Sequence, residues 1–214
     1  MVSSKVRVWS IQTIPVLEEL NSNGIYRPDP KKITRWVPEI PEEKDPYYHS
    51  YLWMVAEMEK RIPPKPFKGA MPIWGWHQWL GITQPKPDLR SGGHLPPGTR
   101  GVRFELDLDP SRVLISDFDL WFFPFSGIYL GKNNGEDEEF RKLKEKAGLD
   151  YNYGDNLDLP DHLMRILHKS WERVFDLSFY RPGYNDGKNK KALQATFWEI
   201  RQEDVRKAQE FTAR

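Results

Sequence analysis

The stretch Val102-Arg103-Phe104-Glu105-Leu106-Asp107-Leu108 places an apolar residue at every second position and a charged residue between each pair. Because successive side chains of a strand point to opposite faces, this alternation predicts a strand with one buried face. Asp109-Pro110 follows, and proline ends the strand because it has no backbone N–H to donate. The stretch therefore predicts a sheet with one face against a core.

Two other segments have the alternation and the β-branched and aromatic residues that are typical of strands. They are residues 5–12, near the N-terminus, and residues 193–200, near the C-terminus. We expect both to belong to the same sheet system as residues 102–108. A short apolar run over residues 113–116 predicts a further strand.

Helical periodicity, capping residues and stop signals predict five helices between and after these strands, over residues 16–23, 48–62, 136–147, 160–175 and 202–211. Proline and charge over residues 26–46, and proline, glycine and arginine over residues 85–101, predict two long surface loops. Strands and helices interleave without regular βαβ periodicity. This order predicts a single α+β domain over residues 1–214, with central antiparallel or mixed sheets and flanking helices.

Composition excludes several classes of site. The 214 residues include 32 Lys and Arg against 31 Asp and Glu, a formal charge of +1 that gives no long-range argument for a nucleic-acid or membrane partner. The chain has no cysteine, which excludes disulfides, thiolate metal sites and cysteine nucleophiles. No segment is apolar enough for a signal peptide or a membrane span, so we expect a cytoplasmic protein.

Common catalytic patterns are also absent. The five histidines are scattered and form no His-Glu-x-x-His pattern, so we expect no metal site. Gly-x-Ser-x-Gly, the signature of a serine nucleophile on a tight turn, does not occur.

The stretch from Met71 to Trp79 has three indoles and an imidazole within nine residues. Such a group can stack on a flat ligand or fill a core, and the residues alone leave both uses open. In an extended chain Trp74 and Trp76 would share one face. We expect instead that the chain bends at Gly75 and separates the two indoles, because glycine often marks a bend.

Two charged residues are candidates for a site. Arg90 begins a loop with two glycines, where a guanidinium could meet phosphate oxygens and the backbone could approach a ligand. If the last strand is unbroken, Glu199 lies on the same face as its apolar residues. Such an apolar environment would raise the pKa of the Glu199 carboxyl. If the strand instead ends near Trp198, Glu199 faces water.

Six motifs resemble a bacterial family of unknown function that carries the number 3841. They are Val8-Trp-Ser-Ile-Gln12, Trp53-Met54 with Met58 and Arg61, Pro72-Ile-Trp-Gly-Trp76, Leu114-Ile-Ser-Asp-Phe-Asp-Leu-Trp121, Ser170-Trp-Glu-Arg-Val-Phe-Asp176 and Gln194-Ala-Thr-Phe-Trp-Glu199. The resemblance spans nearly the whole chain. The family label implies no activity.

A more remote resemblance is to ADP-ribosyltransferases, especially the DNA-targeting DarT group. Residues 8–24 resemble their first strand and the helix that ends in glycine, and Arg61 resembles an arginine that precedes an aromatic stretch in those enzymes. Their last strand contains Gln-Ala-Glu with a catalytic glutamate. Here Thr196 stands at that third position, so Glu199 would have to take the role from a shifted register.

The second resemblance implies an ADP-ribosyltransferase-like fold and an enzyme that uses NAD to modify a nucleic acid or a protein. Glu199 and Arg61 would be catalytic, and NAD would be bound by Ser10, Gln12, Trp74, Trp76, Arg90 and Thr196. We expect Ser10, Gln12, Arg61, Trp74 and at least one of Thr196 and Glu199 to line one concave pocket. The alternative is a nucleotide- or protein-binding module without catalysis.

Overall fold

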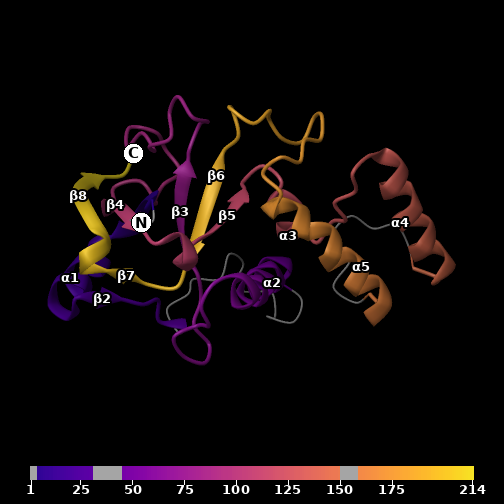
Figure 1. The fold of residues 1–214 in the computed structure, drawn as a ribbon, viewed down its shortest axis with the longest axis horizontal. Coiled ribbons are helices and arrows are strands. Elements are labelled where there is room, and N and C mark those ends of the chain that lie inside the picture. Colours follow the sequence, from indigo (N-terminus) through magenta and orange to yellow (C-terminus); the bar gives the residue numbers. More distant parts are fainter. Residues whose placement is uncertain (1–3, 31–44, 150–158) are drawn as a thin grey trace. The chain divides into compact units, whose positions relative to one another are not determined.

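The computed structural model describes residues 4–30, 45–149 and 159–214. The chain falls into two compact units (Figure 1). The first, which we call the sheet unit, comprises Met1–Ile33, Val55–Ile115 and Asn189–Arg214. The second, the helical unit, comprises Thr34–Met54 and Ser116–Lys188. Most of the surface loop expected over residues 26–46 lies outside the described residues.

Six strands form one sheet in the order β5-β6-β3-β1-β4-β8 (Figure 1). They are β1 (Val6–Thr13), β3 (Ile73–Gln78), β4 (Arg100–Leu108), β5 (Leu114–Asp117), β6 (Leu193–Phe197) and β8 (Val205–Thr212). β1 pairs antiparallel with both β3 and β4, β3 with β6, and β4 with β8. The three strands expected in one sheet system are therefore β1, β4 and β6, and this prediction is confirmed, as is the α+β class.

One face of this sheet forms the core of the sheet unit. The alternating residues of β4, from Val102 to Leu108, are fully buried on the same face as Val8. Helix α1 (Ile14–Asn23) packs against this face through Val16 and Leu20. Each large aliphatic side chain buried in this way contributes roughly 1.5–3 kcal/mol to stability. The alternation in the sequence thus specifies the core directly.

The last part of the chain is not helical. The prediction of a helix over residues 202–211 is wrong. Only Gln202–Asp204 forms a short 3-10 turn, and β8 then pairs along β4 from Val205 opposite Leu106 to Thr212 opposite Arg100. Most side chains of β8 are exposed, so its backbone pairing with β4 and not burial of an apolar face holds this segment in place. Backbone pairing with the open edge of β4 overrides the local helix signal.

A second, smaller sheet shapes the region around Glu199. Strand β6 ends at Phe197, earlier than expected, and the two-residue strand β7 (Ile200–Arg201) pairs antiparallel with β2 (Ile25–Tyr26). Tyr26 lies opposite Ile200 in this pairing. The expected strand over residues 193–200 is therefore interrupted where the chain passes from one sheet to the other.

The helical unit contains α3 (Phe122–Phe125), α4 (Asn134–Lys146), α5 (Asp161–Trp171) and a 3-10 turn, Glu172–Phe175, that continues α5. Residues 46–54 of α2 (Pro46–Arg61) also belong to it. The helices expected over residues 16–23, 48–62, 136–147 and 160–175 are confirmed as α1, α2, α4 and α5 with its 3-10 extension.

Aromatic side chains hold the helical unit together. Trp53 stacks on Phe175 with ring centroids 5.7 Å apart and meets the edge of Trp171 at 5.4 Å. The indole N–H of Trp171 donates to the carbonyl of Ile128 at 2.6 Å, which satisfies its polar atom inside the core. Among the described residues, no helix is long and apolar enough to cross a membrane.

Candidate functional site

Glu199 lies in the short break between β6 and β7, next to Trp198. Both residues are buried, with exposed fractions of 8% and 6%. Neither sequence interpretation fully describes this result. The strand does end before Glu199, as one interpretation expected, but the carboxylate does not face water. It is enclosed by charged side chains from other segments.

Three arginines surround the Glu199 carboxylate. Arg27 Nε donates to Oε2 at 2.8 Å and Arg201 Nε donates to Oε1 at 2.6 Å. Arg112 Nη2 lies 3.8 Å from Oε1, and its Nη1 donates to both carboxylate oxygens of Asp204 at 3.0 and 2.9 Å. The site is therefore a network of ion pairs in which Arg112 links two buried acids, Glu199 and Asp204.

The fold explains how these arginines meet. The pairing of β2 with β7 places Tyr26 opposite Ile200, so the same antiparallel register continued by one residue brings Arg27 opposite Glu199. Arg112 ends a 3-10 turn, Pro110–Arg112, whose start is capped when Asp109 accepts a hydrogen bond from the Ser111 N–H. Turn and strand pairing together fix the positions of the guanidinium groups.

The arginines decide the protonation state of Glu199. Burial acts to raise the pKa of its carboxyl, but hydrogen bonds from Arg201 and Arg27 outweigh burial and hold that pKa below its ordinary value. The sequence-based expectation of a raised pKa is therefore wrong, because that expectation included neither the nearby Arg201 nor the distant Arg27. Glu199 is ionised at neutral pH.

A cavity of about 520 Å³ opens at this network. Its described lining residues are Arg27, Pro63, Pro64, Pro66, Ser111, Arg112, Trp198, Glu199 and Arg201. The prolines form an apolar wall, and Trp198 is fixed beside them because its indole N–H donates to the Pro63 carbonyl at 2.8 Å. Ligand pockets typically measure roughly 300–1,000 Å³, so this cavity has the size of a small-molecule site.

Ser10 and Gln12, expected to bind NAD, lie on the core face of β1. Ser10 is opposite Phe104 and is fully buried. Its hydroxyl donates to the Trp74 carbonyl at 2.9 Å and accepts from Gln12 Nε2 at 2.8 Å. The hydroxyl of Ser10 thus hydrogen-bonds to Gln12 and to the backbone of the neighbouring strand β3.

Trp74 and Trp76 share one face, because β3 is extended through Gly75. The expected bend at Gly75 is wrong. A Cβ at this position would lie 2.6 Å from Val8 Cγ1 and 3.0 Å from the Trp9 carbonyl oxygen, so glycine permits close packing of β1 against β3. The two indoles are both half-buried.

The face that holds the two indoles is opposite to the core face. Trp76 pairs with Trp9 on one side and with Gln194 on the other, and Trp74 pairs with Thr196. Thr196 is fully buried, and its hydroxyl donates to the Leu114 carbonyl at 3.4 Å. The sheet therefore separates Trp74, Trp76 and Thr196 from the side chains of Ser10 and Gln12.

The two remaining predicted cations have local acidic partners. Arg61 Nη1 lies 2.5 Å from Oε2 of Glu57, one turn earlier on α2. Arg90 is exposed and binds Asp88, and hydrogen bonds from Arg90 lower the pKa of that carboxyl to about 2. Of the predicted site residues, Glu199 alone is among the described lining residues of the 520 Å³ cavity.

Sequence reasoning missed Arg27, Arg112, Arg201 and the three prolines of the cavity wall. In the sequence, Pro63-Pro64 indicates only the end of the helix expected over residues 48–62, and no motif marks the arginines. Arg27 and Glu199 are 172 positions apart, so no local spacing could have linked them. Among the residues that the structure describes, no group of three or more His, Asp or Glu could hold a metal ion.

The fold and the site together define an α+β protein with an ion-paired, arginine-lined cavity beside a six-stranded sheet. A family model described as "Domain of unknown function (DUF3841)" matches residues 7–206. The chain belongs to this family, which confirms the first resemblance. No curated protein and no solved structure matches the chain.

Proposed function

We propose that this protein is a nucleotide-binding module without catalysis, and that the cavity at Glu199 holds the nucleotide. The observation that carries this proposal is the combination of three guanidinium groups, one ionised carboxylate and an apolar proline wall around about 520 Å³. Guanidinium forks suit phosphate oxygens, and a carboxylate accepts hydrogen bonds from ribose hydroxyls.

The arginines have donors to offer a phosphate. Arg27 and Arg201 bind Glu199 through Nε, and each guanidinium carries five N–H donors in all. Their side chains are 42% and 43% exposed, and Arg201 Nη1 also lies 3.5 Å from Oε1 of the exposed Glu203, so both side chains are partly open to solvent. Arg112 is more buried and is anchored by Asp204, which suits a role in fixing the Glu199 carboxylate.

The same contacts argue against acid catalysis by Glu199. Both of its carboxylate oxygens accept hydrogen bonds, and a carboxyl with a lowered pKa is a poor proton donor at neutral pH. Arg61, its expected catalytic partner, is ion-paired with Glu57. Binding is therefore the function that these groups support best.

Calorimetric titration with ADP and with adenosine tests the proposal. We expect ADP to bind and adenosine to bind at least about tenfold more weakly, since the phosphate contacts are charge-assisted. Arg27→Ala should weaken ADP binding about tenfold. Arg100→Ala is the matched control and should leave ADP binding unchanged, because it removes an exposed arginine of β4 that is paired with Glu210 of β8. Equal affinities for ADP and adenosine would contradict the proposal.

One observation favours a second candidate function, an NAD-consuming ADP-ribosyltransferase. An ionised carboxylate beside guanidinium groups could stabilise the oxocarbenium-like state that forms when the nicotinamide–ribose bond breaks. Nicotinamide release separates the two candidates. A transferase supplied with NAD and a DNA or protein acceptor releases nicotinamide, and Glu199→Gln stops it. A binding module consumes no NAD.

A further inference from the structure

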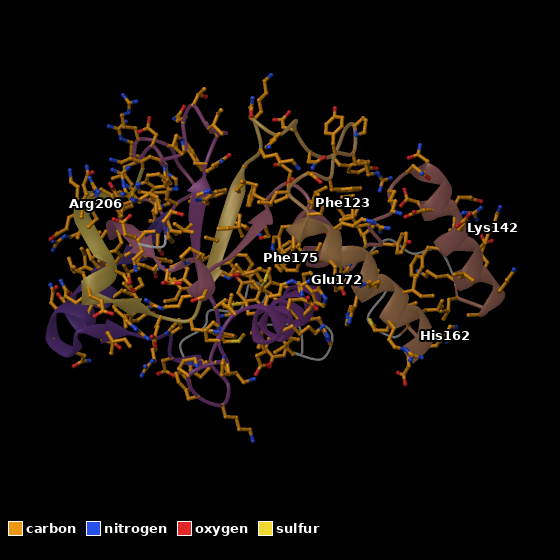
Figure 2. The ribbon with its side chains drawn as sticks, viewed as in Figure 1. Phe123, Lys142, His162, Glu172, Phe175 and Arg206 are labelled. Atoms are coloured by element: carbon orange, nitrogen blue, oxygen red, sulfur yellow. The ribbon has the colours of Figure 1, made fainter. Side chains whose placement is uncertain are left out.

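One face of α5 carries a row of basic side chains. His162, Arg165, Lys169 and Arg173 follow one another at spacings of three or four residues, which places them on the same side of the helix and its 3-10 extension. Figure 2 shows His162 and Glu172 toward opposite ends of α5. This row lies entirely within the helical unit and is separate in the chain from the residues around Glu199.

A cavity of about 460 Å³ lies along this row. Its described lining residues are Tyr129, His162, Arg165, Ile166, Lys169, Ser170 and Arg173, and none of these is acidic. We call this the α5 cavity. Its lining has cations, two hydroxyl groups and one apolar side chain, so its chemistry suits an anion and disfavours a cation.

Among the described residues, two of the basic groups have carboxylate partners and two do not. Lys169 Nζ lies 2.7 Å from Oε2 of Glu172, and Arg173 Nη2 lies 2.9 Å from Oε2 of Glu136. Within the described residues, neither His162 nor Arg165 has an ion pair. The Nε of Arg165 donates to a backbone carbonyl, that of Asp161, at 3.3 Å. The guanidinium of Arg165 is therefore the group most ready to bind an external anion.

The other lining residues form a fixed surface beside the cations. Tyr129 stacks on the buried Phe140, with ring centroids 4.4 Å apart and ring planes 10° apart. Burial raises the pKa of the Tyr129 hydroxyl, while a hydrogen bond from Arg173 acts in the opposite direction. The hydroxyl stays protonated at neutral pH and can donate.

Ser170 and Ile166 complete the wall. The Ser170 hydroxyl donates to the Leu167 carbonyl at 2.6 Å and accepts from the Leu130 N–H at 3.0 Å, so its position is set on both sides. Ile166 is partly exposed and gives an apolar surface. A ligand can thus place an apolar or flat part here while its charge meets the basic row.

We propose that the α5 cavity binds an organic phosphate, with the phosphate held by His162, Arg165 and Lys169 and the organic part against Tyr129 and Ile166. The guanidinium fork of Arg165 can bind two phosphate oxygens at once, and the ammonium group of Lys169, one turn along the helix, can bind a third. The volume accommodates a ligand of metabolite size. A free phosphate ester and the phosphorylated end of an oligonucleotide share this chemistry. The proposal does not rest on the nucleotide site at Glu199.

Titration with phenyl phosphate tests the α5 cavity, and phenol is the uncharged control. We expect phenyl phosphate to bind and phenol not to bind. Arg165→Ala should weaken the binding of phenyl phosphate about tenfold. Arg165→Lys keeps the charge but loses the fork of donors, so it should weaken this binding less. Lys142→Ala, an exposed change on α4, should have no effect. Thermal unfolding of each variant checks that it is folded.

Arg27→Ala separates this inference from the proposed function, because Arg27 lines the other cavity. Binding of phenyl phosphate that is lost with Arg27→Ala and retained with Arg165→Ala would overturn the inference. Equal binding by the wild-type protein and Arg165→Ala would also overturn it. Hexathymidylate with and without a 5′-phosphate distinguishes the sources. A preference for the phosphorylated strand over phenyl phosphate supports an oligonucleotide end, and the reverse preference supports a free ester.

Discussion

The charge of Glu199 is stabilised by Arg27, 172 positions away along the chain, and by Arg201, two positions away. A carboxylate next to apolar strand residues would be expected to resist ionisation, because burial disfavours the charged form. The guanidinium groups reverse this outcome. At the scale of the residue, the protonation state depends on one neighbour in the sequence, Arg201, and on one partner, Arg27, that only the fold brings close.

This reversal predicts how stability depends on pH. The pKa of Glu199 is lower in the folded state than its ordinary value of 4.5, so the folded protein favours the ionised form. Its stabilisation is therefore complete above pH 4.5 and is lost as the pH falls through the lowered pKa. We expect Glu199→Gln to cost about 1–2 kcal/mol at pH 7, a value reduced by the exposure of Arg27 and Arg201, and less at pH 3.

Urea unfolding of the wild-type protein and Glu199→Gln at both pH values measures this difference. Glu203→Gln is a suitable control, because Glu203 is mostly exposed and lies 3.5 Å from Arg201 without reaching the Glu199 cavity. A cost of Glu199→Gln that stays constant from pH 7 to pH 3 would show that the ion pairs do not supply the stabilisation.

At the scale of the element, β3 shows why a glycine signal was misinterpreted. Gly75 favours a bend when only the local chain is considered. In the sheet, the same residue allows β1 and β3 to approach, because a side chain would collide with Val8 and the Trp9 carbonyl. Strand β3 therefore stays extended, and Trp74 and Trp76 lie on one face.

This arrangement predicts similar costs for truncating the two indoles. Both are half-buried, so Trp74→Ala and Trp76→Ala should each cost about 1–3 kcal/mol. Trp53→Ala should cost more, roughly 3–5 kcal/mol, because Trp53 is buried between Trp171 and Phe175. Urea midpoints measure all three.

ADP titration of the same variants adds a functional comparison. Neither Trp74 nor Trp76 is among the described lining residues of the Glu199 cavity, so ADP affinity should not change. The opposite result would be a large loss of stability for one variant and a loss of ADP binding for the other. That result would support the predicted bend at Gly75, which the structure contradicts.

At the scale of the whole molecule, the charges nearly cancel, with a formal net charge of +1. The basic groups described above act locally, since several are paired with neighbouring acids. Non-specific DNA binding is mainly electrostatic and needs many unpaired cations. We expect no saturable binding of a random DNA duplex below about 10 µM at physiological salt. Fluorescence anisotropy with a labelled duplex measures this, and tight, salt-sensitive binding would contradict it.

Patterns within short stretches of sequence were enough to predict many of the elements. The alternation from Val102 to Leu108 predicted β4, and the periodicity over residues 160–175 predicted α5 and its extension. These signals work because burial on one face imposes a period of two on a strand and 3.6 on a helix. The segment over residues 202–211 failed because its side chains are mostly exposed and the edge of β4 decided its structure.

The sequence by itself determined the α+β class, the apolar face of the sheet, most of the helices and the membership of the DUF3841 family. Tertiary structure alone decided the site. Arg27, Pro63, Arg112 and Glu199 come from separate segments, and they meet because β2 pairs with β7 and the 3-10 turn at Arg112 lies beside that pair. Local patterns record which face a residue buries. They do not record which distant residue neutralises its charge, since that contact forms only when the chain has folded.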